Sequence, residues 1–366
     1  MRACIVGAGL AGSLLAWRLA RATTGWRIDL VAGDRRPGTG DRRPDATAVS
    51  GGAVRVYEPE PEQRRLAVDS MVELMGSRTL REWAGYRTAR TVYLGQRHDT
   101  AALADIEAAL PGWAQVATPA ELAQEGWADV PGDAVAVVEP GAGFTSPDQL
   151  REAVLADGPV RRAVTVHEGT VDAITPREDG TVACTVAGQV REYDLVVIAA
   201  GPWTPALLRA SGLPADGYRT KSIQYTVYRT GDWRPPVFID GVAGLYGRPT
   251  ADGGLLLGQP SQQWDVDPDR PPVTPDLHDE AARLAGIRFP RLRIGEPVRR
   301  VGAADCYAAQ PILSLRPVQG SGLFTFSGGA GGSVKTALAA SHRAATQLES
   351  GNPLQLASVG LRKGQP

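Results

Sequence analysis

The feature that most constrains this chain is the glycine pattern GAGLAG near its start, in which Gly7, Gly9 and Gly12 follow the spacing GxGxxG. The short apolar run at residues 2–6 predicts a strand before it, and the periodicity of SLLAWRLARAT predicts a helix after it. Gly7 allows a tight turn, Gly9 lets a pyrophosphate approach the backbone, and Gly12 lets helix and strand pack closely. Because a helix N-terminus presents free N–H groups to phosphates, the segment, Ala11 included, predicts a dinucleotide site.

The end of the next predicted strand lacks a residue that this kind of site usually has. WRIDLVAG is typical of a strand, and the position where Glu or Asp would bind a ribose hydroxyl is Ala32. Asp34 and Arg35 follow in the loop GDRRPG, and we expect them to contact the cofactor from there. A backbone contact, with Asp34 as a plain turn residue, stays open as the alternative.

A further strand of the same sheet is expected much later in the chain. The stretch 191–208, REYDLVVIAAGPWTPALL, predicts a buried strand over Leu195–Ala200 that ends at Gly201 before a helix. Residues 64–85 between these segments predict a long helical stretch, so strands and helices do not alternate as in simple NAD enzymes. A sheet assembled from such distant segments is typical of FAD folds, and an ordinary buried strand of another α/β protein is the alternative.

Composition excludes several classes of protein. The chain has 366 residues, of which 43% are apolar and 22% are charged, as in soluble globular proteins of one large or two domains. A net charge of −1 does not indicate nucleic acid or an anionic membrane as a partner. No apolar run approaches the roughly 20 residues that span a bilayer, and the early first strand leaves no room for a signal peptide. The three cysteines are an odd number and predict no disulfide framework, so we expect a cytoplasmic protein. The four scattered histidines predict no metal site.

A glycine-rich turn with a lysine lies near the other end of the chain. The segment FTFSGGAGGSVKTALAASH covers residues 324–342, and its Lys335 is one of only three lysines among 39 basic residues. A lysine retained at such a turn is a candidate for a specific role in binding. A solvated residue at the start of a helix is the simpler interpretation.

Several segments together resemble a known family. GAGLAGSLLAWRLA, EPGAGFTSPDQLREAVL, VHEGTVDAI, DLVVIAAGPWTPALL and FTFSGGAGGSVKTALAAS occur in the order seen in the D-amino-acid oxidase superfamily. The chain is most similar to the monomeric sarcosine oxidase branch, whose YGFP motif corresponds to YGRP at residues 246–249. A cysteine of that branch corresponds to Cys306 in DCYAAQPILSL. The resemblance covers residues 1–350.

The resemblance implies a fold and a reaction. The expected fold is α/β, with a Rossmann-like FAD-binding domain of the glutathione-reductase type from residues 1–45, 145–215 and 310–350. Residues 46–144 and 216–309 would form an interleaved substrate-binding domain on a mixed β-sheet, and residues 351–366 a C-terminal tail. The implied reaction is hydride transfer to FAD from the carbon beside an amine nitrogen, which gives an imine. The expected partners are a small amine or an N-substituted or cyclic amino acid, and oxygen or another electron acceptor.

The resemblance also implies site residues. Lys335 and Arg55 would pair with the substrate carboxylate, Tyr246 would hydrogen-bond the substrate, and a second arginine of the family is missing near Gly52. An ordinary strand aromatic is the alternative for Tyr246. The residues expected to contact FAD are Gly7, Gly9, Ala11, Gly12, Asp34, Arg35, Ser50, Val171, Gly201, Cys306, Gly329, Gly331 and Gly332.

Two positions bear on how the flavin would react. The lysine that promotes reaction with oxygen in the sarcosine oxidase branch corresponds to Leu256 or Leu257, which implies slow reaction with oxygen. The sulfur of Cys306 would be bonded covalently to the flavin, and a buried free cysteine is the alternative. A flavin dehydrogenase or specialised biosynthetic oxidase with poor oxygen reactivity therefore stays open, as does a non-catalytic FAD-binding protein.

Overall fold

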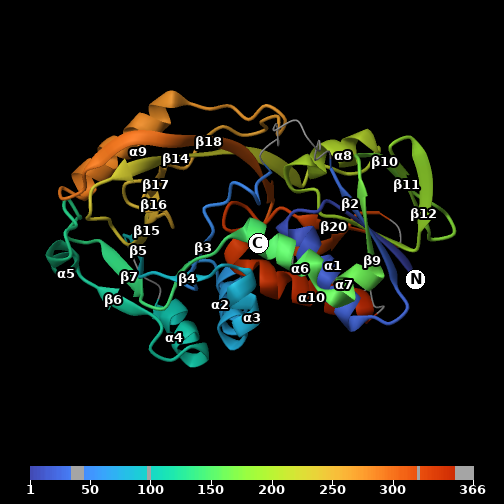
Figure 1. The fold of residues 1–366 in the computed structure, drawn as a ribbon, viewed down its shortest axis with the longest axis horizontal. Helices are drawn as coiled ribbons and strands as arrows, with labels where there is room; N and C mark the ends of the chain where they lie inside the picture. Colours follow the sequence, from blue (N-terminus) through green and yellow to red (C-terminus); the bar gives the residue numbers. More distant parts are fainter. Residues whose placement is uncertain (34–44, 97–99, 320–321, 351–366) are drawn as a thin grey trace, which may run out of the picture.

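The computed structural model describes residues 1–33, 45–96, 100–319 and 322–350. A six-stranded sheet and an eight-stranded sheet lie toward opposite ends of the long axis, and the helices α1, α2, α3, α6 and α10 lie between and below them (Figure 1). The predicted contacts of Asp34 and Arg35 fall outside the described residues.

The six-stranded sheet is built around the first strand of the chain. β1 (Arg2–Val6) pairs in parallel with β2 (Arg27–Ala32) on one side and with β13 (Leu195–Ile198) on the other. The strand order is β19-β20-β13-β1-β2-β9, with the outer strands β9 (Val164–Glu168), β20 (Leu323–Ser327) and the antiparallel β19 (Ser314–Pro317). Buried apolar residues of α1 (Leu10–Ala22) and α10 (Ala337–Glu349) cover it. The predicted α/β fold, with a strand that returns at residue 195, is confirmed.

The eight-stranded sheet is mixed. β15 runs parallel to β5, whereas all other neighbouring strands of this sheet are antiparallel. Its strands, in sheet order, are β18 (Ile294–Ala308), β14 (Tyr218–Thr230), β17 (Leu255–Gly258), β16 (Leu245–Pro249), β15 (Val237–Asp240), β5 (Thr91–Gly95), β7 (Val135–Glu139) and β6 (Gln115–Ala117). The long strands β14 and β18 extend from this sheet toward the six-stranded one (Figure 1). The division of the chain into two domains at the boundaries expected above stays a prediction.

Two small sheets complete the β-structure of the described residues. One has the order β10-β11-β12, with β10 (Val171–Pro176), β11 (Val182–Val186) and β12 (Gln189–Tyr193). The other has the order β3-β8-β4, with β3 (Ala53–Val54), β8 (Gly143–Phe144) and β4 (Arg87–Thr88). Because β3 leads directly into residues 55–58, this short sheet fixes the position of the segment that carries Arg55.

The long helical stretch expected over residues 64–85 consists of two consecutive helices. α2 (Pro61–Gly76) ends at Ser77, whose backbone is extended and whose side chain accepts a hydrogen bond from the N–H of Leu80 at the start of α3 (Arg78–Trp83). A serine that caps the second helix thus ends the first. The remaining α-helices are α4 (Thr100–Ala109), α5 (Pro119–Gln124), α6 (Pro147–Ala156), α7 (Gly158–Ala163), α8 (Thr204–Ala210) and α9 (Pro275–Arg288).

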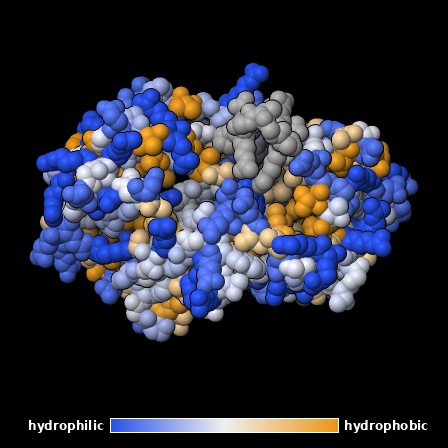
Figure 2. Space-filling model, viewed as in Figure 1, coloured by the Kyte–Doolittle hydropathy of each residue, from blue (hydrophilic) through white to orange (hydrophobic). Residues whose placement is uncertain are grey.

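The face of the molecule that Figure 2 shows is mainly polar. Hydrophilic residues cover most of the face seen in Figure 2, and hydrophobic residues appear there in small separate groups. Within the described ranges, no helix combines the length and the apolar character that crossing a membrane requires.

Candidate active site

The glycines of the first loop lie where a side chain cannot fit. Gly7 has a φ of +112°, and a Cβ atom there would collide with the carbonyl group of Ala199, which follows β13. A Cβ atom on Gly12 would collide with the carbonyl oxygen of Gly7. The tight turn and the close helix–strand packing inferred from the sequence therefore have a direct steric cause.

The N-terminus of α1 offers a site for an anion. Its first residue is preceded by Gly9, which provides no side-chain cap, and the first turn contains no acidic residue. The N–H of Leu10 donates to Oγ1 of Thr47 at 2.9 Å, so residues after the undescribed segment return to this helix end. The positive end of the helix, with Ala11 in its first turn, suits a pyrophosphate. These residues fit FAD, although the contacts themselves stay predictions.

Three more of the predicted cofactor residues lie on three separate segments. Gly201, with a φ of +53°, follows β13 at the same edge of the sheet as Gly7. Ser50 accepts a hydrogen bond from the N–H of Gly52 at 3.1 Å, and Val171 is the first residue of β10. Ligands of open α/β sheets bind outside the carboxyl ends of the strands, where Gly7 and Gly201 lie.

A buried cluster of charges joins Arg55 and Lys335, the two residues predicted to bind a carboxylate. Oε1 of Glu58 lies 2.7 Å from Nη2 of Arg55 and 3.0 Å from Nζ of Lys335, and each of the three side chains is about one-tenth exposed. Burial by itself raises the pKa of Glu58, but the charges of Arg55 and Lys335 outweigh it and lower that pKa. Burial lowers the pKa of Lys335, against the opposing effect of Glu58. The chain therefore already supplies a carboxylate for both cations.

A second buried carboxylate holds the turn that carries this cluster. Glu139 at the end of β7 accepts hydrogen bonds from the backbone N–H groups of Val56 and Tyr57, at 2.8 and 2.9 Å. The indole of Trp113 donates to it at 2.9 Å. The guanidinium of Arg55 lies 5.0 Å from the centre of the Tyr93 ring and donates to the carbonyl of Tyr57. Arg55 is thus fixed on three sides.

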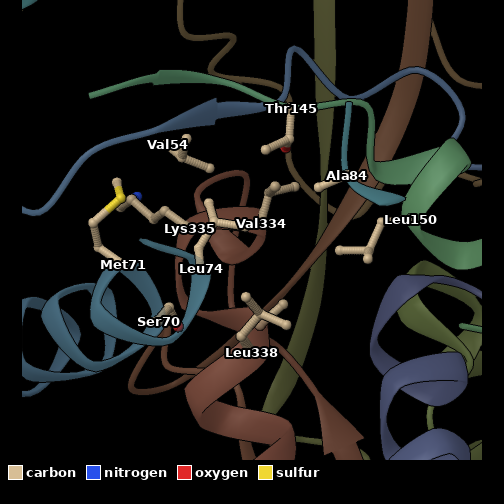
Figure 3. A pocket seen from close by; sticks show the side chains of 11 residues that line it. Val54, Ser70, Met71, Leu74, Ala84, Thr145, Leu150, Val334, Lys335 and Leu338 are labelled. Carbon is tan, nitrogen blue, oxygen red and sulfur yellow. The ribbon is translucent and has the colours of Figure 1, made fainter. Parts of the chain in front are cut away.

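Lys335 also borders a small cavity beneath β3. Its side chain extends toward Met71 of α2, and the cavity is lined mainly by apolar residues (Figure 3). The lining residues are Val54, Ser70, Met71, Leu74, Ala84, Thr145, Leu150, Val334, Lys335, Ala337 and Leu338. This environment explains why burial lowers the pKa of the Lys335 amine.

Tyr246 lies on a face of the eight-stranded sheet, among different residues from those that surround Lys335. Its hydroxyl donates to the carbonyl of Gln224 at 2.9 Å. A Cβ atom on Gly258, directly opposite on β17, would lie 2.5 Å from the ring, so only glycine accommodates it. Tyr225, also opposite Gly258, donates its hydroxyl to the carbonyl of Val49 at 2.7 Å. The segment after the undescribed residues 34–44 is therefore packed on this face.

Arg248 lies on the same face, two residues beyond Tyr246, because side chains alternate along a strand. Its guanidinium lies 4.5 Å from the centre of the Phe144 ring and donates through Nε to the carbonyl of Gly51. Nη1 donates to the carbonyl of Pro249 at 2.8 Å. Burial lowers the pKa of Arg248. Sequence reasoning missed this residue, although it is the departure from YGFP to YGRP.

Asp305 is the least compensated buried charge on this face. It lies opposite Lys221 in the pairing of β18 with β14 and is only 8% exposed. Burial raises its pKa to about 7, against the effect of Lys221. Oδ2 of Asp305 has no hydrogen-bond partner among the described residues. Nζ of Lys221 instead lies 4.7 Å from the ring centre of Trp264 and 5.7 Å from that of Tyr307.

The glycine loop at residues 328–332 contacts both Asp305 on the sheet face and Lys335 of the Glu58 cluster. Gly329 forms a bridge with β18. A Cβ atom on Gly331 would lie 2.8 Å from Oδ2 of Asp305, whereas the carbonyl of Gly332 accepts a hydrogen bond from Nζ of Lys335 at 3.2 Å. Adjacent residues of one loop therefore contact the sheet face and the Glu58 cluster.

Cys306 lies between Asp305 and Tyr307 on β18, so its side chain is on the opposite face of the strand. It is buried and free. Burial and the nearby Asp305 raise the pKa of its thiol to about 12, which opposes formation of the thiolate that attack on a flavin methyl group requires. A covalent bond to the flavin stays a prediction.

Alternation also separates the two leucines that the sequence could not distinguish. Leu256 lies opposite Arg248 and packs with Tyr225 and Tyr246. Leu257 lies on the other face, in a separate apolar cluster. Of the two leucines, Leu256 is therefore the one that faces the candidate site.

Sequence reasoning missed Glu58, Glu139 and Asp305 as well as Arg248. Their positions in the sequence could have indicated two of them, because Glu58 lies three residues after Arg55 and Asp305 directly precedes Cys306. Within the described residues, no group of three or more His, Cys, Asp or Glu side chains is arranged to hold a metal ion.

Solved structures of similar fold cover nearly the whole chain. Glycine oxidase from Bacillus cereus matches with a TM-score of 0.74 at 17% identity, over 100% of this chain and 99% of that one. A variant of NikD, described as an unusual amino acid oxidase essential for nikkomycin biosynthesis, matches with 0.74 at 16%, over 100% and 98%. L-α-glycerophosphate oxidase from Mycoplasma pneumoniae, with FAD bound, matches with 0.76 at 17%, over 95% and 94%. At these identities the likeness shows the fold.

The sequence itself places the chain in a family. No curated protein matches it closely enough to count as a relative. The profile of the FAD dependent oxidoreductase family, DAO, matches residues 2–347. The dinucleotide loop, the six-stranded sheet, whose strands are parallel except for β19, and the glycine loop that follows β20 all lie within that match. The chain therefore belongs to the DAO family of FAD dependent oxidoreductases.

Proposed function

We propose that this protein oxidises a C–N bond of a small amine or amino acid and gives an imine. The observation that carries the proposal is the sheet face with Tyr246, Arg248 and the buried Asp305, against which the glycine loop packs. FAD, when bound, supplies the acceptor for the hydride. Residues Gly7–Gly12 and the N-terminus of α1 are suited to hold its pyrophosphate.

The charges on this face favour a nitrogen substrate. A buried carboxyl group such as Asp305 stabilises a ligand that donates N–H bonds or carries positive charge. The same carboxyl group disfavours a phosphorylated alcohol, because a phosphate would add negative charge beside it. Glycine oxidase and NikD, both of similar fold, act on amino acids according to their names, whereas α-glycerophosphate oxidase of similar fold does not. Asp305 therefore favours the amine over the phosphorylated alcohol.

The chain's own residues would bind and orient the substrate and exclude water. An amine that enters in its neutral form needs no histidine as a base. The described part of the face, which presents no histidine, fits such a substrate. Arg55 and Lys335 bind a substrate carboxylate only if Glu58 gives up one of them, because Glu58 contacts both cations. Arg248 has no such carboxylate partner among the described residues, and this makes it the stronger candidate.

The test is anaerobic reduction of the bound flavin. Purified protein with FAD is mixed with glycine, sarcosine, L-proline and α-glycerophosphate, and loss of the yellow flavin absorbance is followed. We expect at least one amino acid to bleach the flavin, with release of ammonia or an amine after hydrolysis, and α-glycerophosphate to have no effect. Bleaching by α-glycerophosphate alone would refute the proposal. Readmission of oxygen then separates an oxidase from a dehydrogenase.

A further inference from the structure

We propose that Asp305 is a catalytic residue, which accepts the proton that a substrate ammonium group loses before the neighbouring carbon gives up its hydride. This inference rests on the proposed function and adds that the protein takes up its amine as a cation. Alkylamines are almost entirely protonated at neutral pH, since their pKa values lie near that of the lysine side chain, about 10.4. Only the neutral amine has the free electron pair that the forming imine needs.

One oxygen of the Asp305 carboxyl group has no partner. The residue is more than nine-tenths buried, yet Oδ2 accepts no hydrogen bond within the described part of the chain. Lys221 lies opposite it in the strand pairing, but its Nζ lies over the ring of Trp264, 4.7 Å from the ring centre. Leaving a buried acceptor unsatisfied is costly, and more so when it is charged. A ligand that donates an N–H bond to Oδ2 removes this cost.

The carboxyl group lies beside the apolar part of the same sheet face. Asp305 and Ala303 are two residues apart on β18, so their side chains lie on one face of the strand. Ala303 belongs to the apolar cluster against which Tyr246 packs. Burial, and after it the charge of Asp305, raise the pKa of Tyr246, so these two side chains lie within electrostatic range. A substrate with its nitrogen at Oδ2 therefore has an apolar surface for its carbon atoms.

The glycine loop leaves the approach to Oδ2 open. A Cβ atom on Gly331 would lie 2.8 Å from Oδ2, closer than a side chain can come without displacing it. Gly331 itself is exposed to solvent. A ligand therefore finds no side chain of this residue in its way, and a proton on Oδ2 can return to water along the same route.

The surroundings of Asp305 suit a group that gains and loses a proton. The titratable groups around it are Lys221 on β14, Tyr246 on β16, and Cys306 and Tyr307, which flank it on β18. Burial raises the pKa of Asp305 to about 7, against the effect of Lys221. Burial lowers the pKa of an amine bound beside it. The two pKa values therefore converge, which lets the proton move from nitrogen to oxygen.

The proposed step transfers one proton. An N–H bond of the ammonium group breaks, an O–H bond forms at Oδ2, and the electron pair stays on the nitrogen. That pair becomes the second bond of the imine when the neighbouring carbon loses its hydride to the acceptor of the proposed function. The carboxylic acid then returns its proton to water. A positioned proton acceptor typically accelerates a reaction by about 10²–10⁴-fold.

Binding of an amine that cannot react tests whether Asp305 receives the ammonium group. tert-Butylamine has no hydrogen on the carbon that bears its nitrogen, so it cannot be oxidised there. Its dissociation constant is measured from changes in flavin absorbance between about pH 5.5 and about pH 9, in wild type, Asp305→Asn and Asp265→Asn. Asp265→Asn is the matched control, because Asp265 is exposed and paired with Arg219 at 2.6 Å.

We expect wild-type binding to be constant above about pH 7 and to weaken about tenfold per pH unit below it. Below pH 7 the cation has to displace a proton from the carboxyl group, and this competition causes the loss. Asp305→Asn should bind at least about tenfold more weakly at about pH 8 and should show no loss toward acid pH. Asp265→Asn should follow wild type.

The rate of flavin reduction at saturating substrate distinguishes a proton acceptor from an anchor for the cation. The substrate is the amine or amino acid that bleaches the flavin in the anaerobic test. We expect the wild-type rate constant to be independent of pH from about 7.5 to 9, and Asp305→Asn to lower it about 10²–10⁴-fold at the lower pH. This loss should shrink as the pH rises, because the solvent then removes the proton. A wild-type rate constant that rises about tenfold per pH unit over the same range would refute the proton transfer.

Other outcomes would also overturn the inference. If wild type does not bind tert-butylamine, or if Asp305→Asn binds it as wild type does, the carboxylate does not meet the amine. If Asp305→Asn loses FAD while Asp265→Asn retains it, Asp305 contacts the cofactor instead. The two wild-type pH profiles decide the question even if Asp305→Asn does not fold. If no amine or amino acid bleaches the flavin, the oxidation and the proton transfer are both rejected, whereas pH-dependent binding of tert-butylamine would still place an amine at Asp305.

Discussion

Replacing Glu58 with glutamine should destabilise the protein strongly. The change removes the carboxylate that Arg55 and Lys335 both contact and leaves two buried cations without it. Breaking a buried ion pair from one side typically costs about 3–5 kcal/mol. Arg55 retains the carbonyl of Tyr57 and the ring of Tyr93, whereas Lys335 retains only the carbonyl of Gly332 among its described hydrogen bonds. Most of the lost free energy of unfolding therefore comes from the buried charge of Lys335.

The proton of Lys335 sets an upper limit to that loss. A lysine with an unfolded pKa of 10.5 can escape the cost of burial by becoming neutral, which at about pH 7 requires about 5 kcal/mol. This cost is present when the pH is well below 10.5 and disappears as the pH rises toward that value. The stabilisation by Glu58, whose folded pKa is lowered from 4.5, is present above 4.5 and is lost as the pH falls through the folded pKa. The difference between wild type and Glu58→Gln should therefore be largest near neutral pH.

The assay is urea unfolding, followed by far-UV circular dichroism with FAD in constant excess, near neutral pH and at about pH 9.5. We expect a loss of about 3–5 kcal/mol near neutral pH that shrinks at the higher pH. Lys335→Met should cost less, because Glu58 keeps Arg55, and adding it to Glu58→Gln should recover stability. Glu82→Gln, in an exposed pair with Arg78, is the control and should not shift the midpoint. A loss for Glu58→Gln as small as that of the control would refute the reasoning.

Three further outcomes are expected. Gly12→Ala should weaken FAD binding at least about tenfold in equilibrium dialysis, because its methyl group would collide with the carbonyl oxygen of Gly7, whereas Gly286→Ala, with open space around it, should not. Reduced wild-type flavin should react slowly with oxygen because Leu256 provides no charge on the site face, and fast reoxidation in a stopped-flow trace would contradict this. Acid precipitation tests the predicted bond to Cys306: a yellow pellet that Cys306→Ala makes colourless would demonstrate it, whereas FAD released intact from wild type, the result that the raised thiol pKa of about 12 favours, would exclude it.

Local patterns were sufficient for the elements near the cofactor loop. The apolar run at residues 2–6, the glycine spacing and the helical periodicity are all properties of neighbouring residues, and β1 and α1 form there. The segment TADGG, which joins β16 and β17, likewise contains the glycine and aspartate residues that are typical of turns. The break of the helical stretch at Ser77 was not predicted, because a capping side chain competes there with the helical pattern on both sides of it.

The charged groups of the site could not be predicted in the same way. Glu58 acquires its role from Lys335, far away in the sequence, and nothing near either residue indicates the pair. The face on which Asp305 lies depends on how β18 pairs with β14, and a shift by one residue would exchange it with Cys306. Lys335 illustrates the limit most clearly, since its neighbours suggest a solvated helix start, whereas the fold buries its side chain beside Glu58.

The order of strands in the six-stranded sheet bears on how the protein is made. β1 is synthesised first, but its neighbour β13 emerges only at residues 195–198, and β20, which covers the other side of β13, only at residues 323–327. Strands that are buried on both faces expose apolar edges until their partners arrive, and unpaired edges promote aggregation. A ribosome must therefore release nearly the whole chain before the cofactor loop has its support. We expect truncation before residue 323 to yield insoluble protein rather than a smaller folded unit.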